Sequence, residues 1–364
     1  MTVSREQVVA FRLGRHHLGA RTTPLEAAYV GLQDTPPGAA GTAFAARADG
    51  GPEAFESQLV ILPSLRGAPM AVDPAEQAIF TAAIAPRDED DAKVVVGNAW
   101  KPLERHGAME ALDIAGEAVR EVLAAGPVVK TDFHRELTER VPEDLRWWCK
   151  GCGEHHVHPS LWRATGIRGV LAIVGRDGRS PVYGAPPEAP AVDDPGAELA
   201  RRFLRLYGPA RPKLLADFAG ISTAHATELW ERAGELAEVA LEGKKAWLLA
   251  EDVGAASDPP AIAGVRLLPS LDPLAGGRDR ELLVPDAAAR KRIWAMLGGA
   301  GMVLADGEVA GTWRPAKKGR KLVVTVTPLS PGALRGRDGE LAAEAERLAP
   351  FRGAELAELV LARA

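Results

Sequence analysis

A short polar segment near the start of the chain, "GLQDT" at residues 31–35, carries side chains that could take part in chemistry. A glutamine amide such as that of Gln33 can accept a hydrogen bond from water and donate another. Asp34 is the only carboxylate in the segment that could act as a base. Side chains two residues apart in an extended turn point to the same side, so Gln33 and Thr35 should face together. The alternative is a plain polar turn, in which Thr35 caps a helix that starts at Pro36.

A second segment, "WWCKGCGEHHVHP" at residues 147–159, has residue types that are typical of metal sites. Its two cysteines have the CxxC spacing of a zinc knuckle, and histidines follow within a few residues. The candidate ligands are Cys149, Cys152, His156 and His158. A zinc ion held by them would be structural and would clamp the start of a helix at Pro159. The alternative is a pair of reduced thiols beside a solvated run of histidines.

Basic residues gather in the C-terminal part of the chain. Seven lysines and arginines, and no acidic residue, lie between Val309 and Arg337. Five of them fall on "RPAKKGRK", which we expect to be the tip of a β-hairpin. The net charge of −5 gives no overall attraction to nucleic acid, so DNA binding would need a local basic patch of this kind. The alternative is a solvated turn that is basic for solubility.

The composition limits the class of protein. A length of 364 residues suits two to four modules, and 46% hydrophobic with 26% charged residues is normal for a globular protein. The longest apolar runs, such as residues 169–175, are too short to span a bilayer, and the N-terminus lacks the apolar stretch of a signal peptide. Two cysteines exclude a disulfide framework. We therefore expect a cytoplasmic protein without membrane contact.

The order of the patterns predicts an α+β fold. Helices at residues 109–124 and 131–141, a possible recognition helix at 159–166 and a hairpin at Asp177-Gly178 indicate a winged helix. After a linker at 184–197 the same order returns, with a helix capped by Ser222 and a hairpin at Glu242-Gly243. A strand-rich region with a final helix pair indicates a small β-barrel-like module. The expected modules are an N-terminal helical or winged-helix module at 1–105, winged helices at 106–185 and 196–260, and a β-rich module at 261–364. Four tryptophans at or near predicted helices should lie in the core: Trp147, Trp148, Trp162 and Trp230.

Several of these segments resemble one family, the winged-helix DNA-binding proteins that include the AlkZ and YcaQ DNA glycosylases. The similar segments follow the family's order along the chain: residues 59–70, 201–222, 267–285 and 306–314. The resemblance implies tandem winged helices followed by a C-terminal β-barrel. It also implies a DNA glycosylase that repairs alkylated or crosslinked bases in double-stranded DNA, with no cofactor required.

The family's catalytic motif, Gln-x-Gln or Gln-x-Asp after Gly-Leu, falls on "GLQDT". Gln33 takes its first position and Thr35 its second, with Asp34 between them. Removal of a base requires an extruded nucleotide and a water molecule near C1′. The resemblance therefore implies that Gln33 positions this water, with Asp34 or Thr35 assisting.

The family's C-terminal hairpin approaches DNA, which implies phosphate contacts from the basic tip. The candidate DNA contacts are Arg66, Trp313, Arg314, Lys317, Lys318, Arg320 and Lys321. For Trp313 the alternative is a place in the barrel core. Two other functions stay open: a non-catalytic winged-helix DNA-binding protein or regulator, and a metal-responsive regulator that uses Cys149 to His158. The sequence indicates no protein partner.

Overall fold

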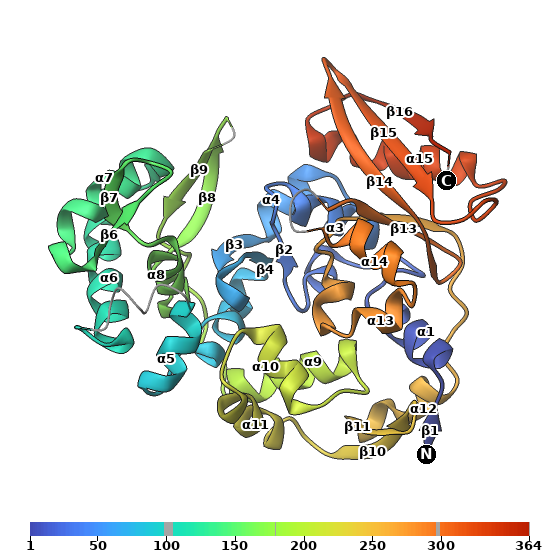
Figure 1. Ribbon diagram of the computed structural model, residues 1–364, viewed down its shortest axis with the longest axis horizontal. Helices are drawn as coiled ribbons and strands as arrows, with labels where there is room; N and C mark the ends of the chain where they lie inside the picture. The colour runs from blue at the N-terminus through green and yellow to red at the C-terminus, as the bar shows by residue number, and fades with distance from the viewer. Residues whose placement is uncertain (98–104, 179, 296–298, 364) are drawn as a thin grey trace. The chain divides into compact units, whose positions relative to one another are not determined.

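The computed structural model describes residues 1–97, 105–178, 180–295 and 299–363, and it confirms the α+β class (Figure 1). The chain forms two compact units, each assembled from separate segments. Unit 1 consists of Met1–Leu59, Arg201–Leu214 and Gly234–Ala364. Unit 2 consists of Val60–Ala200 and Leu215–Ala233. Two of the four boundaries between them fall within helices α9 (Pro195–Tyr207) and α10 (Pro212–Ala219), and the others follow Leu59 and Ala233.

Unit 1 contains short helices around two sheets. The helices are α1 (Arg5–Arg15), α2 (Pro24–Ala27), α3 (Ala39–Arg47), α4 (Pro52–Gln58), α12 (Val253–Ser257), α13 (Arg280–Leu283), α14 (Ala287–Ile293) and α15 (Asp338–Leu348). Helix α1 starts at a capping box, in which the Ser4 hydroxyl accepts from the Gln7 N–H at 3.2 Å and the Gln7 side chain accepts from the Ser4 N–H at 2.8 Å. Helix α2 has Thr23 as its N-cap, with a hydroxyl that accepts from the Glu26 N–H at 3.3 Å, and it ends after four residues.

The smaller sheet of unit 1 has the order β1-β10-β11, and its strands are β1 (Thr2–Val3), β10 (Leu236–Leu241) and β11 (Lys244–Leu249). Strand β1 pairs parallel with β10, which ties the N-terminus to a segment more than 200 residues away. The hairpin between β10 and β11 turns at Glu242 and Gly243, which confirms the sequence prediction. A short strand β2 (Leu32–Gln33) precedes α3.

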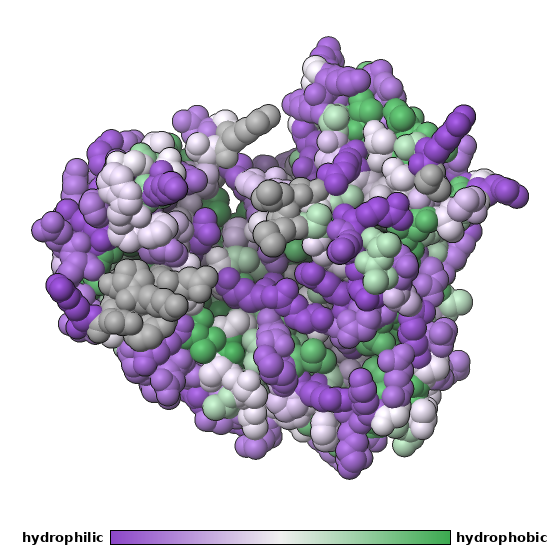
Figure 2. Space-filling model, viewed as in Figure 1, coloured by the Kyte–Doolittle hydropathy of each residue, from purple (hydrophilic) through white to green (hydrophobic). Residues whose placement is uncertain are grey.

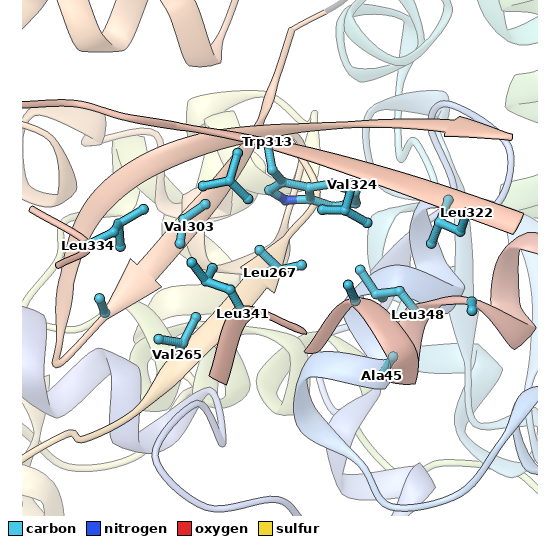
Figure 3. Close-up of a cluster of buried hydrophobic side chains, with 14 of the residues drawn as sticks. Ala45, Val265, Leu267, Val303, Trp313, Leu322, Val324, Leu334, Leu341 and Leu348 are labelled. Atoms are coloured by element: carbon cyan, nitrogen blue, oxygen red, sulfur yellow. The ribbon is translucent and has the colours of Figure 1, made fainter. Parts of the chain in front are cut away.

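The larger sheet of unit 1 has the order β12-β13-β14-β15-β16. Its strands are β12 (Val265–Leu268), β13 (Gly301–Ala305), β14 (Glu308–Lys318), β15 (Lys321–Pro328) and β16 (Leu356–Leu361). Figure 3 shows its core, in which Trp313, Leu267 and Val324 come from strands and Leu341 and Leu348 from α15. The predicted abundance of strands in the C-terminal part of the chain is therefore confirmed.

Two expectations for this module are corrected. Among the described residues the larger sheet is open, with β12 and β16 as its edges, rather than closed into a barrel. The final helix of the predicted pair, residues 339–351, is confirmed by α15, but it does not end the fold: α15 is followed by β16, which pairs parallel with β15 and was not predicted. The six-residue segment "LAELVL" is a mostly apolar run of strand length, a signal that was not used in the prediction from the sequence.

Unit 2 contains the helices α5 (Glu89–Val96), α6 (Ala108–Leu123), α7 (Lys130–Arg140), α8 (Pro159–Ala164) and α11 (Thr223–Glu231). Its main sheet includes β4 (Pro69–Val72), β3 (Val60–Pro63), β8 (Ala172–Asp177), β9 (Ser180–Gly184) and β5 (Val128–Val129), in that order. A separate hairpin is formed by β6 (Arg146–Cys149) and β7 (Glu154–Val157).

Several sequence predictions for unit 2 are confirmed. Strands β8 and β9 flank the predicted Asp177-Gly178 turn, and the Ser222 hydroxyl accepts from the His225 N–H at 3.0 Å at the start of α11. Trp162 and Trp230 are buried as expected. Trp148 was predicted near a helix and in the core, but it lies in strand β6 and is 54% exposed.

Hydrophilic residues cover most of the face drawn in Figure 2, and hydrophobic residues appear there only in small separate areas. Among the helices of the described ranges, none combines the length and the apolar character that crossing a membrane requires.

Candidate functional site

The polar turn at residues 31–40 is held by Asp34. Its side chain is buried, and Oδ1 accepts hydrogen bonds from the N–H groups of Gly38 at 2.6 Å and Ala40 at 3.2 Å. These donors lie at the start of α3, where N–H groups have no partner within the helix and a negative charge is favourable. Asp34 therefore fixes the turn against the helix, and one of its oxygens is committed to that role.

Thr35 does not cap a helix, which corrects the sequence-based alternative. Helix α3 begins only at Ala39, and its N-cap residue is Gly38, which has a φ of 87°. A left-handed φ of this kind favours glycine. Because Asp34 already supplies the acceptor for the helix start, Thr35 is left to line a cavity. Gln33 precedes it at the end of β2 and is partly buried.

The cavity has a volume of about 400 Å³ and lies within unit 1. Thr35, Pro36 and Ala39 form one wall. The other walls come from segments far along the chain, and their residues are Pro269, Ser270, Leu271, Arg280, Ile293, Trp294, Ala295, Gly299, Gly301, Trp313, Pro315 and Arg352. Two arginines and no carboxylate are among these residues. The residues that line the cavity therefore carry two positive charges and no negative one.

Arg280 is placed in this cavity by an aromatic ring. Its guanidinium lies over the ring of Trp294, 4.7 Å from the centroid, and the Trp294 indole donates to the Ser270 carbonyl at 2.8 Å. Burial, followed by the charge of Arg278, lowers the pKa of Arg280 from its ordinary value. Its Nε is buried and has no hydrogen-bond partner among the described residues. A buried donor without an acceptor indicates a place for a ligand or water.

Arg352 reaches the cavity from the segment after α15. It donates to the Thr42 hydroxyl of α3 at 2.7 Å, and its Nε too is buried without a partner in the described part of the chain. Burial lowers the pKa of Arg352, and the charge of Asp34 opposes this shift. Asp34 therefore interacts both with the start of α3, through hydrogen bonds, and with Arg352, through its charge.

A close backbone approach shapes the wall opposite the turn. A Cβ on Gly301 would lie 2.2 Å from Trp313 Nε1 and 2.6 Å from the Leu268 carbonyl oxygen. The Trp313 indole donates to that carbonyl at 2.8 Å. Only glycine leaves space for this bond, so Gly301 sets the position of the tryptophan wall.

The basic hairpin tip is less positive than the sequence suggests. Lys321 pairs with Glu358 at 2.9 Å, and Arg320 pairs with Glu355, because β16 lies beside β15. Lys317 and Lys318 are exposed on β14, and neither has an ion pair with a described acidic residue. These two lysines are the cations most available to an anionic partner.

The other candidate DNA contacts lie in different settings. Arg314 is exposed on β14, next to Trp313, which is only 2% exposed and belongs to the core, as its alternative interpretation held. Arg66 lies in unit 2, where it donates to the Phe218 carbonyl and its guanidinium lies over the Phe218 ring. Arg66 also has a φ of 58°, and its backbone packs against Gly220.

The candidate metal ligands lie on the hairpin β6–β7. Cys149, Cys152 and His156 have one ligand atom each within 4.8 Å of the others. The Cys152 N–H, and then the His156 ring, lower the pKa of the Cys149 thiol to about 7. His158 is not part of this group. It is the N-cap of α8, and its Nδ1 accepts from the Ser160 N–H at 3.1 Å.

The candidate residues named from the sequence did not include Arg280, Arg352 and Trp294, which line the cavity. Two features of the sequence could have identified Arg280. It lies in "GGRDRELLVP", within a segment that the family resemblance covers, and it stands at the start of a helix. Arg352 carries no local signal, because its place in the cavity depends on the packing of α15 against the sheet.

Known proteins were compared with this chain. A family model described as DNA glycosylase AlkZ-like matches residues 27–351. The chain is 28% identical over 149 residues to the interstrand DNA cross-link repair glycosylase of Streptomyces sahachiroi, a match that covers 38% of this chain and 38% of that protein. The solved structure of the Streptomyces sahachiroi DNA glycosylase AlkZ is similar over the whole of both chains, with a TM-score of 0.74 and 22% sequence identity. The structural similarity shows a shared fold.

Proposed function

Because the chain belongs to the AlkZ-like DNA glycosylase family, we propose that it is a monofunctional glycosylase that excises N-alkylated or crosslinked bases from double-stranded DNA. The main support is the cavity beside the "GLQDT" turn, which carries two arginines and no carboxylate on its walls. The related Streptomyces sahachiroi protein is named as an interstrand DNA cross-link repair glycosylase.

In the proposed reaction a water molecule held by Gln33 attacks C1′ of the extruded nucleotide. The bond from the water oxygen to C1′ forms as the glycosidic bond to the base nitrogen breaks, and the electron pair leaves with the base. An N-alkylated purine is cationic, so it departs as a neutral base and needs little protonation. The proton of the attacking water passes to solvent. No cofactor takes part in this scheme.

Asp34 acts in this scheme as a positioning residue. One of its oxygens accepts two backbone N–H groups at the start of α3, which favours a fixed carboxylate over a mobile base. Its negative charge lies close to the turn and would favour the oxocarbenium-like transition state. Thr35, on the cavity wall, would hold the nucleotide or a second water molecule.

Arg280 and Arg352 are suited to a DNA phosphate. A cationic base would be repelled by two guanidinium groups, whereas a phosphate beside the extruded nucleotide would be attracted. We therefore assign the arginine side of the cavity to the backbone and the turn to the sugar. The exposed Lys317 and Lys318 would add phosphate contacts outside the cavity. The order of helices and hairpins along the chain supports winged-helix modules as further duplex contacts.

The test is release of free 7-methylguanine from alkylated duplex DNA. Gln33→Ala should lower single-turnover excision by about 10²–10⁴-fold, the usual effect of losing a group that activates water. Gln58→Ala is the matched control, because Gln58 is an exposed glutamine at the end of α4. Both variants should bind DNA like wild type. Equal excision by wild type and Gln33→Ala would exclude the assigned role.

A second candidate is a non-catalytic DNA-binding protein. It is favoured by Thr35, which stands where the family has glutamine or aspartate, and by the engagement of Asp34 with α3. In this case wild type would release no base, whether alkylated or crosslinked, while salt-dependent DNA binding persists. That result would decide against the glycosylase.

A further inference from the structure

The hairpin β6–β7 directs three metal-ligating side chains to one place. Cys149 pairs with Glu154 and Trp147 pairs with His156 across the two strands. Paired residues share a face, and residues two apart along a strand share it too, so Cys149 and His156 lie diagonally on the same face. The turn from Cys149 to Gly153 brings Cys152 back toward them, and their ligand atoms all lie within 4.8 Å. Thiolates on one tetrahedral zinc are roughly 3.8 Å apart, so a small contraction suffices.

His156 has the tautomer that metal binding needs. Its Nδ1 lies 2.8 Å from the Val157 carbonyl oxygen. A carbonyl only accepts, so Nδ1 carries the proton and donates, which leaves the lone pair on Nε2. Histidine ligands of metals usually donate their second ring N–H in this way.

His134, on helix α7, offers a fourth ligand. Its Nε2 is buried and has no hydrogen-bond partner among the residues that the structure describes. Its ring centroid lies 6.3 Å from that of His156, and α7 packs against β7. Two Nε2 atoms bound to one zinc ion are roughly 3.3 Å apart, so the His134 ring must move toward His156 by roughly 1 Å to join the three ligands that already lie together. A coordinated ion would also satisfy a buried nitrogen that otherwise costs stability.

His158 is unsuited to the role that the spacing predicted for it. Its Nδ1 accepts the Ser160 N–H, and its ring lies against Trp147 with centroids 4.4 Å apart. With Nδ1 as an acceptor, the neutral ring carries its proton on Nε2, which then has no lone pair for a metal. Metal binding by His158 would therefore require loss of the helix cap.

We propose that Cys149, Cys152, His156 and His134 bind one zinc ion that joins the hairpin β6–β7 to helix α7. Four protein ligands close the tetrahedron, which is the arrangement of structural rather than catalytic zinc. A two-stranded hairpin is only marginally stable by itself, so an ion at its turn would hold the hairpin β6–β7 against α7, which packs beside β7 (Figure 1).

The first experiment measures the zinc content of the full-length protein, purified without chelators from zinc-supplemented cells. We expect about one zinc per chain, and loss of the metal in Cys149→Ser/Cys152→Ser. His155→Ala is the control, because His155 is an exposed histidine on the opposite face of the same hairpin. Protein that carries no zinc, or whose two cysteines form a disulfide instead, would overturn the proposal.

The second experiment identifies the fourth ligand through competition with a chromogenic chelator. His134→Ala should weaken zinc binding by at least about 10–100-fold, and His134→Cys should restore it because a thiolate replaces the imidazole. His158→Ala should bind zinc like wild type. Cobalt(II) should give the intense absorption of a tetrahedral ion in wild type and in His134→Cys, but not in His134→Ala. Weakening by His158→Ala, with His134→Ala unaffected, would reject this ligand set.

Discussion

Unit 1 holds arginines in its interior in two different ways. Arg47 is 1% exposed and forms a two-point ion pair with Asp272, one of whose contacts measures 2.9 Å. Arg12 is equally buried and pairs with Asp279 at 2.8 Å. Arg280 and Arg352 instead face a cavity, and neither forms an ion pair with a described carboxylate. Arginines of the first kind have their charge neutralised by a carboxylate of the protein. Arginines of the second kind have a positive charge that a bound anion could neutralise.

This difference separates structural arginines from binding arginines in a way that burial alone does not. Arg47 and Asp272 satisfy each other, so removing one partner leaves an isolated buried charge. Arg280 and Arg352 are partly desolvated without an ion-pair partner among the described carboxylates, and burial lowers the pKa of each. Charged side chains whose pKa values are shifted by burial in a cavity are typical of functional sites.

The largest expected effect is on the stability of unit 1. Arg47→Ala should lower the free energy of unfolding by about 3–5 kcal/mol, because Asp272 would remain buried and charged. Urea denaturation followed by circular dichroism measures this. The double variant Arg47→Met/Asp272→Leu removes both charges and should recover most of the loss. If Arg47→Ala alone were as stable as wild type, the distinction between the two kinds of arginine would fail.

Substitution of the cavity arginines should affect DNA binding rather than stability. Arg280→Gln and Arg352→Gln should leave stability near that of wild type but weaken DNA binding by about 10–100-fold each, the usual value of a charge-assisted hydrogen bond. Arg292→Gln, at an exposed position of α14, is the control. Fluorescence anisotropy with labelled duplex DNA measures the affinity. A large loss of stability without a change in affinity would make these arginines structural.

The smallest expected effects are those of lysine substitutions at the hairpin tip on the salt dependence of DNA binding. Lys317→Gln and Lys318→Gln should each reduce the slope of log affinity against log salt by about 0.9, the value for one phosphate contact. Lys321→Gln should change it less, because Lys321 is paired with Glu358. Equal effects of all three substitutions would show that the ion pair does not restrain Lys321. These changes should not depend on DNA sequence.

Structural features that depend on neighbouring residues could be predicted from the sequence. Capping at Ser222 and the turns at Asp177-Gly178 and Glu242-Gly243 depend on neighbouring residues, and all three are confirmed. The four-module division of the chain and the individual site residues stay predictions.

Features that depend on distant packing could not be predicted. Glu355 and Glu358 reduce the charge of the hairpin tip because β16 pairs with β15, and β16 was not predicted from the sequence. The fixed carboxylate of Asp34 replaced Thr35 as the acceptor at the helix start. His134 and His156 are separated by an intervening helix end and hairpin, so no spacing rule joins them.

The discontinuous assembly of unit 1 has a consequence for its synthesis. The turn that carries Thr35 is made early, while the opposite walls of its cavity, and finally Arg352, are made late. At about 5–20 residues per second, a ribosome takes roughly 15–60 s to cover the distance between them. Throughout this interval the apolar faces of α1 and α3 lack their later partners. A product truncated before Arg352 would therefore lack this part of the cavity wall even where the turn at Thr35 has formed.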